Sequence, residues 1–315
     1  MNTTTLNRFL SVLTLVGVVV AGVKYLDPEA MGAAWQHFTW PSLGLMVVLS
    51  AFYLLAKAAR FCILMGAVTE VDRSSVVWGY AASQAASLLP GGVAFRAATM
   101  SQLGVPVEKT AGPVLANSGL DQFFLLITGI VLCYWYPQLR IPAMVLTALL
   151  VVLIAVLANE GSRGWVKSAL RRLLPEDRCD NFFEAMTLLW DRRVLGWSLL
   201  WTTLANLTSF SNLCLVVYAL DLPLEPWPLA AAFVIPTLLG RLSPLPAGAG
   251  VTEAGMVAFM AGKTSLSLNQ AAVATAVFRV VDVILPALYG LVIYYTLWQK
   301  TRPAEPQLEE QAQAA

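Results

Sequence analysis

The chain has 315 residues, of which 58% are hydrophobic and only 12% are charged. Soluble domains are about half apolar and a quarter charged, so this composition excludes a water-soluble globular protein. The net charge of +1 gives no indication of a nucleic-acid partner. The sequence therefore predicts an all-α polytopic membrane protein that lies almost entirely in the bilayer.

Six apolar runs are predicted to cross the bilayer as helices. In chain order they cover residues 9–23, 43–65, 114–136, 141–158, 195–219 and 283–298. The first run has a thin basic flank, and no small-residue cleavage site follows before Lys24 and Tyr25, which favours a retained signal anchor. We expect one transmembrane domain over residues 1–300.

The positions of the basic residues set the orientation, because Lys and Arg concentrate in cytoplasmic loops. Placing the N-terminus inside assigns fourteen of the 20 Lys and Arg residues to the cytoplasm. Lys57, Arg60 and the basic residues of the polar stretch 160–194 are among them. Three basic residues fall outside, namely Lys24, Arg140 and Lys263. The predicted topology has both termini inside.

Two further segments, residues 74–104 and 227–262, contain a Leu-Pro-x-Gly break followed six or seven residues later by a charge. The breaks and charges are Pro90, Gly91, Gly92 and Arg96 in the first segment, and Pro246, Gly248, Gly250 and Glu253 in the second. Alternation of the spans makes the first a re-entrant hairpin from the cytoplasm and the second one from outside. The predicted inverted repeats, about 74–136 and 227–298, would place a cavity near the midplane. Simple proline kinks in ordinary spans are the alternative.

Six charged residues are predicted at membrane depth, where an uncompensated charge costs about 3 kcal/mol. They are Arg96, Arg241 and Arg279, with Asp121, Glu253 and Asp282. Such residues usually pair or face water, so each is a functional candidate. The predicted substrate-binding residues are Arg96, Asp121, Glu253, Arg279 and Asp282.

Each charge also has a structural interpretation. Arg279 and Asp282 are three residues apart, which allows a local pair on one helix face. Glu253 lies near the start of a half-helix, where the helix dipole favours a carboxylate. Arg96 suits a phosphate headgroup, although it could instead reach the inner headgroups as a surface anchor.

The remaining features give no indication of an enzyme. Residues 160–194 are predicted to be a basic connector, and residues 301–315 a disordered cytoplasmic tail. The single histidine, His37, lies beside Trp35 and Trp40, which favours an interfacial anchor. No phosphate loop, metal-ligand spacing, disulfide spacing or nucleophile motif is present in the sequence, so we expect no metal and no cofactor.

One stretch carries a family resemblance: residues 245–253, Leu-Pro-Ala-Gly-Ala-Gly-Val-Thr-Glu, followed by Arg279, Asp282 and the Pro286-containing last helix. With Pro90 to Arg96 and Asp121, it resembles the lysylphosphatidylglycerol synthase transmembrane region family. The resemblance covers about residues 43–298 and implies the translocator half of such proteins, without the C-terminal synthase domain. Family members tend to carry an Arg three residues before Asp121, whereas this chain has Ser118.

The expected function is that of a flippase-like lipid translocase in the cytoplasmic (inner) membrane, with an anionic or aminoacylated phospholipid as its substrate. Ion-coupled transport of a small solute, a channel, or an accessory subunit of a lipid-modifying enzyme are the alternatives. A second copy of the chain or a lipid-synthesising enzyme is left open as a partner.

Overall fold

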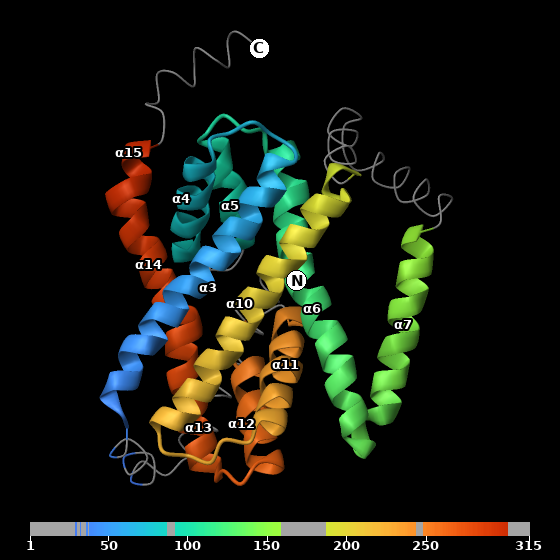
Figure 1. Cartoon of the computed structure of the whole chain (residues 1–315), viewed down its shortest axis with the longest axis vertical. Coiled ribbons are helices and arrows are strands. Elements are labelled where there is room, and N and C mark those ends of the chain that lie inside the picture. Colours follow the sequence, from blue (N-terminus) through green and yellow to red (C-terminus); the bar gives the residue numbers. More distant parts are fainter. Residues whose placement is uncertain are drawn as a thin grey trace, which may run out of the picture. The chain divides into compact units, whose positions relative to one another are not determined.

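The computed structural model describes residues 29, 32, 36, 38–86, 92–158, 187–243 and 248–301. Every regular element within these ranges is helical, as Figure 1 shows. The predicted first span at 9–23, His37, residues 159–186 of the connector and the tail from residue 302 lie outside the described residues. The all-α architecture of a polytopic membrane protein is confirmed.

Four helices in the described ranges are long and apolar enough to cross a membrane. They are α3 (Trp40–Gly66), α6 (Val107–Trp135), α10 (Arg192–Ala219) and the continuous helix Leu268–Trp298. The shortest has 27 residues, or about 40 Å at 1.5 Å per residue, which exceeds a hydrocarbon core of about 30 Å. They coincide with four of the predicted spans.

The last long helix starts earlier than the sequence indicated and is not uniformly α-helical. It begins with α13 (Leu268–Arg279), widens into the π-helical turn η4 (Val280–Ile284), continues as α14 (Leu285–Ile293) and ends in a second π-helical turn, η5 (Tyr294–Trp298), before α15 (Gln299–Thr301). Ser267 and Gln270 form a capping box that starts α13. The predicted apolar run started only at residue 283, because Arg279 and Asp282 precede it, although the sequence already placed these two charges on one helix.

Shorter helices occupy the two segments that the sequence marked as broken. They are α4 (Arg73–Ser83), the 3₁₀ turn η1 (Gln84–Ala86) and α5 (Gly92–Ser101) in the first segment, and α11 (Pro226–Leu242) and α12 (Val251–Lys263) in the second. Helix α4 packs on α5, and α11 packs on α12, as Figure 1 shows. The remaining helices are η2 (Pro137–Leu139) and α7 (Arg140–Ala158), which follow α6; α7 coincides with the predicted run at 141–158.

The chain divides into two compact units, which we describe separately. Of the described residues, the α11–α13 unit contains 38–54, 204–243 and 248–288. The α4–α6 unit contains 55–86, 92–158, 187–203 and 289–301. Each unit therefore contains one broken segment together with the helix that follows it.

In the α11–α13 unit, aromatic stacking and close helix contact form the core. The ring of Phe233 lies 6.0 Å from the rings of both Phe210 and Phe278. Helix α12 approaches α11 closely because Gly255 has no side chain: a Cβ there would lie 2.8 Å from Cβ of Pro236.

In the α4–α6 unit, the C-terminal turn of the chain's last long helix packs on α4. Trp298 is buried and donates through Nε1 to Gln102, 3.1 Å away. Gly79 of α4 leaves the space that this indole occupies. Asp72 caps α4 by accepting hydrogen bonds from Ser74 and Ser75, and these bonds lower the pKa of Asp72 to about 2.

Candidate functional site

Asp121 is the centre of a buried charge cluster in the α4–α6 unit. Its carboxylate lies 2.5 Å from Nη1 of Arg60 and 3.2 Å from Nζ of Lys57. Arg60 also donates through Nε to Asn117 at 2.8 Å and through Nη1 to Thr202 at 2.9 Å. The spacing explains the geometry, since Lys57 and Arg60 are three residues apart on α3 and Asn117 and Asp121 are four apart on α6. Each pair therefore shares one helix face.

The structure corrects the sequence interpretation of Lys57 and Arg60. Both were assigned to a cytoplasmic loop, but α3 extends to Gly66, so both lie inside the helix. Arg60 has no exposed surface, and the side chain of Lys57 is only 11% exposed. Even without these two, more basic residues are assigned to the inside than to the outside, so the predicted orientation does not depend on them.

The position of Arg60 is also relevant to Ser118, where this chain differs from the family pattern. The resemblance leads us to expect an Arg three residues before Asp121, on the same helix. In this chain the guanidinium beside Asp121 belongs to α3 instead. Asp121 thus has a guanidinium partner although position 118 is a serine.

Arg96 lies at a second part of the same unit. From α5 it donates through Nη2 to Oε1 of Gln84 at 3.0 Å, and its guanidinium carbon lies 4.9 Å from the centre of the Tyr80 ring. This stacked geometry is typical of a cation–π contact. Gln84 is buried, and Tyr80 has no exposed surface.

Two hydrogen-bond donors at this point have no partner among the described residues: Nε of Arg96 and the hydroxyl of Tyr80. Buried polar groups nearly always have a partner, because burial without one is unfavourable. Each of these two donors, which lie on stacked side chains, can therefore bind a hydrogen-bond acceptor.

The two parts belong to one electrostatic environment, which we call the cationic cluster: Lys57, Arg60, Arg96, Asp121 and Tyr80. Arg96 stacks on the ring of Tyr80, which lies in the same unit as Lys57, Arg60 and Asp121. The ring of Tyr80 also lies 5.2 Å from that of Phe61, the neighbour of Arg60. The cluster contains three cations and one carboxylate, so it favours an anion.

The α11–α13 unit holds the other predicted charges. Glu253 is the third residue of α12, and its carboxylate accepts a hydrogen bond of 2.6 Å from the Gly250 N–H. The same carboxylate lies 2.6 Å from Nε of Arg279. Glu253 therefore caps a helix start, as its position indicated, and also joins α12 to α13.

Asp282 does not form the local pair with Arg279 that the three-residue spacing indicated. Its carboxylate accepts a hydrogen bond from the Ser209 hydroxyl of α10 instead. Asp282 lies in the π-helical turn η4, where the wider turn changes the stacking of residues three apart. Turns of this kind are frequent at functional sites.

Asn212 adds a polar group near this contact, three residues after Ser209 on α10. It has no exposed surface, and neither its Oδ1 nor its Nδ2 has a partner among the described residues. We call Ser209, Asn212, Glu253, Arg279 and Asp282 the acidic cluster, since it contains two carboxylates and one cation.

The glycines of the second break allow α11 and α12 to meet closely. Gly248 and Gly250 have φ angles of +68° and +84°, which strongly favour glycine. A Cβ on Gly248 would lie 2.8 Å from the backbone of Gly240. Gly92 of the first break begins α5. Pro90, Gly91 and Pro246 lie outside the described residues.

The sequence interpretation missed Lys57, Arg60, Tyr80, Ser209 and Asn212 as site residues. The signal for Lys57 and Arg60 was two cations at helical spacing inside an apolar run. Tyr80, Ser209 and Asn212 carry no comparable signal, because single polar residues are common in such helices. Within the described residues, no three His, Cys, Asp or Glu side chains are grouped to hold a metal ion.

Comparison with known families supports the resemblance. The sequence matches the family described as lysylphosphatidylglycerol synthase TM region over residues 8–290, which is most of the chain. A comparison with curated proteins returned no match. The chain is therefore a multi-pass membrane protein that belongs to the lysylphosphatidylglycerol synthase TM region family.

Proposed function

We propose that this protein is a flippase-like lipid translocase that moves a phospholipid or a modified glycerolipid between the leaflets of the cytoplasmic membrane, and that it is not itself an enzyme. Membership of a family named for the membrane region of a lipid-modifying protein supports a lipid-related role. The observation that carries the proposal is the cationic cluster, because it holds unpartnered donors inside a membrane protein.

The phosphate of a phospholipid fits this cluster chemically. A phosphodiester carries one negative charge and several acceptor oxygens, and a guanidinium is suited to such a group. Nε of Arg96 and the hydroxyl of Tyr80 are the two unpartnered donors available to it. The two positive charges of Lys57 and Arg60 exceed the single negative charge of Asp121 by one, and Arg96 adds a further positive charge. The cluster would then bind the headgroup phosphate.

The short helices are consistent with re-entrant hairpins. Helices α4 and α5 have 11 and 10 residues, so each is about 15 Å long, or half of the hydrocarbon core. Helix α12, with 13 residues, reaches about 20 Å. Because the helices of each pair pack on each other, we infer that each pair enters and leaves on one side.

The inferred hairpins imply an inverted arrangement. If α3 ends inside, α4 and α5 enter from the inside, and α6, α7 and α10 each cross once. Helices α11 and α12 then enter from the outside, and the last long helix returns to the inside. This order is the plan of transporters whose sites lie at broken helices.

The acidic cluster offers a complementary role. Its two carboxylates, Glu253 and Asp282, exceed the charge of Arg279 by one. An ammonium group on an aminoacylated headgroup would compensate this excess. We therefore propose that the cationic cluster, within its own unit, recognises a phosphate, and that the acidic cluster, within the other unit, recognises an amine.

The test is leaflet exchange of a fluorescent phosphatidylglycerol in proteoliposomes, read with a membrane-impermeant quencher. Tyr80→Phe removes one unpartnered hydroxyl and keeps the ring that stacks on Arg96. Tyr295→Phe is the matched control, since Tyr295 is 62% exposed in the same unit. We expect exchange to slow in Tyr80→Phe only, and equal rates in both variants would remove the assigned role of Tyr80.

A second candidate function is ion-coupled transport of a small solute. It is favoured by Asp282, a carboxylate in a π-helical turn hydrogen-bonded to Ser209, with the unpartnered Asn212 one turn away on α10. Intramembrane carboxylates of this kind serve as proton relays. Solute uptake driven by a proton gradient, without lipid exchange in the same liposomes, would favour this second candidate.

A further inference from the structure

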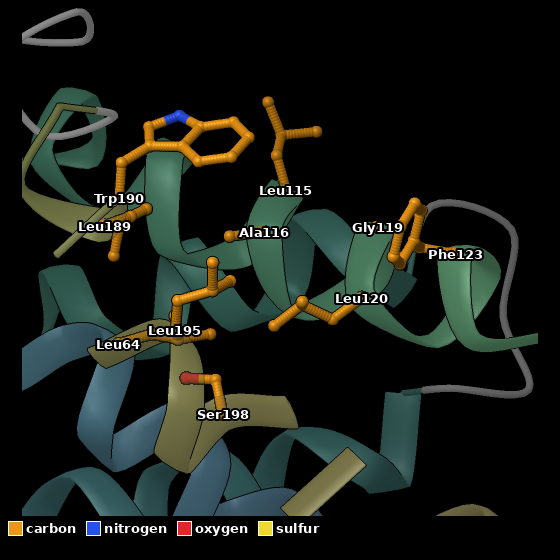
Figure 2. Close-up of a pocket in the computed structure, with 10 residues that line it drawn as sticks. All are labelled: Leu64, Leu115, Ala116, Gly119, Leu120, Phe123, Leu189, Trp190, Leu195 and Ser198. Carbon is orange, nitrogen blue, oxygen red and sulfur yellow. The ribbon is translucent and has the colours of Figure 1, made fainter. Parts of the chain in front are cut away.

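An apolar groove of about 270 Å³ lies in the α4–α6 unit between α6 and the start of α10, and Figure 2 shows the side chains that line it. Its buried wall is formed by Leu64, Leu189 and Ser198, and its exposed wall by Leu115, Phe123 and Trp190. Leu115 and Trp190 are 56% and 64% exposed, so the groove is open on the outer surface of these helices. In a membrane protein, apolar surface of this kind faces lipid chains.

One polar atom lies in this otherwise apolar wall. The hydroxyl of Ser198 is buried, and it has no partner among the described residues. Its backbone carbonyl is already used, because it accepts a hydrogen bond from the Thr202 hydroxyl at 2.7 Å. An unsatisfied hydroxyl is unfavourable in a region without water. The occupant of the groove should therefore be mainly apolar and carry an acceptor at one point.

The groove also adjoins the cationic cluster through two helices. Leu64 lies one turn after Arg60 on α3, and Ser198 lies one turn before Thr202 on α10. Thr202 accepts a hydrogen bond from Arg60, which is paired with Asp121. The acceptor-binding end of the groove is thus next to a site that favours an anion.

We propose that this groove binds one acyl chain of a phospholipid. The ester carbonyl accepts a hydrogen bond from the Ser198 hydroxyl, and the phosphate is directed toward the cationic cluster. A phospholipid has an apolar chain, an ester acceptor at its base and an anionic group beyond it, in the order that the groove presents. The assignment rests on the proposed function for its choice of phospholipid, but it concerns binding and not transport.

Glycine positions provide a matched pair of variants. Gly119 lines the groove, and a Cβ there would meet nothing within 4 Å. Gly196, on α10 in the same unit, is equally open but does not line the groove. Gly119→Trp would fill the groove, while Gly196→Trp places the same side chain on the lipid-facing surface elsewhere. Ser198→Ala removes the hydroxyl alone.

The experiment is photolabelling of the purified protein in liposomes, using phosphatidylglycerol with a diazirine in the middle of one palmitoyl chain. Labelled peptides are mapped by mass spectrometry, and the folding of each variant is checked by size-exclusion chromatography. We expect labels on the peptides that contain Leu115–Phe123 and Leu189–Ser198 in the wild type and in Gly196→Trp. Labelling should fall about tenfold in Gly119→Trp, because the indole would occupy the space of the acyl chain and a packed site does not accept both. In Ser198→Ala it should fall about threefold, the typical effect of one hydrogen bond within a membrane.

The outcomes separate this inference from the proposed function. Labelling does not require exchange, so a protein that exchanges no lipid can still show the groove-dependent label. Equal labelling of Gly119→Trp and Gly196→Trp would overturn the acyl-chain site. So would a dimer of the wild type that only Gly119→Trp disrupts, because the groove would then be filled by a second copy. Equal labelling by phosphatidylglycerol and by a diacylglycerol with the same diazirine chain, which has no phosphate, would overturn the assigned direction of the phosphate.

Discussion

Neutralising Asp121 should destabilise the protein strongly, because it leaves two buried cations without their carboxylate. The side chain of Asp121 is 6% exposed, that of Arg60 is fully buried and that of Lys57 is 11% exposed. Removing one partner of a buried ion pair costs about 3–5 kcal/mol. In Asp121→Asn the amide oxygen can still accept one hydrogen bond from Arg60, so we expect a loss near the lower limit, about 3 kcal/mol.

The assay is equilibrium unfolding in mixed micelles, followed by tryptophan fluorescence. Asp72→Asn is the control: it makes the same chemical change at an exposed helix start, where Asn caps as well as Asp, so we expect a much smaller loss of stability. Adding Lys57→Met to Asp121→Asn should recover part of the loss, since one of the two uncompensated cations is removed. An Asp121→Asn protein as stable as the Asp72→Asn control would refute the reasoning.

Three further predictions concern other parts of the chain. Gly248→Ala should destabilise the α11–α12 contact by about 1–3 kcal/mol, measured by the same unfolding assay, because φ is +68° and a Cβ would meet the Gly240 backbone; unchanged unfolding would contradict the close contact. Ser209→Ala should lower the free energy of unfolding by about 1.5–3 kcal/mol, because the Asp282 carboxylate loses its hydrogen-bond donor. Thr203→Ala is the control, since it removes only a hydrogen bond to the helix backbone. An effect of Ser209→Ala smaller than that of Thr203→Ala would contradict this prediction. The lowered pKa of Asp72 stabilises the folded state above the ordinary pKa of the carboxyl, and this stabilisation is lost as pH falls through about 2. Acid unfolding of Asp72→Asn should therefore depend less on pH between about 4 and 2 than acid unfolding of the wild type. Identical acid profiles of the two proteins would exclude this contribution.

The sequence predicted the helical class and four of the long helices, because apolar runs are local signals. Pro90, Gly91 and Pro246 of the predicted breaks lie outside the described residues. Helix starts were less predictable. The last long helix begins at Leu268, fifteen residues before the predicted apolar run, since Arg279 and Asp282 interrupt the apolar sequence. The division into two compact units depends on long-range packing, which no local pattern reports.

The candidate site was predicted in part, and the errors have a physical cause. Asp121, Glu253, Arg279 and Asp282 were found because charges in apolar runs are rare. Their partners were not, since partners come from other helices: Asp121 pairs with Lys57 and Arg60 of α3, and Arg279 pairs with Glu253 of α12.

The π-helical turn at Asp282 explains the remaining difference. Spacing rules for an ordinary α-helix favoured a pair between Arg279 and Asp282, and the local widening of the helix is not evident in the sequence. The positions of Lys57 and Arg60 could have been predicted from the sequence, because treating α3 as one continuous span places both residues inside it.

The central claim is that this chain moves phospholipid between leaflets, and leaflet exchange tests it most directly. Purified protein in liposomes with a fluorescent anionic phospholipid should make the inner-leaflet label accessible to an impermeant quencher. Protein-free liposomes should retain the protected label, and the Tyr80→Phe variant, reconstituted at the same density, should lose the protection more slowly than the wild type. Equal protection in all three samples, with or without an imposed proton gradient, would contradict the lipid-translocase function.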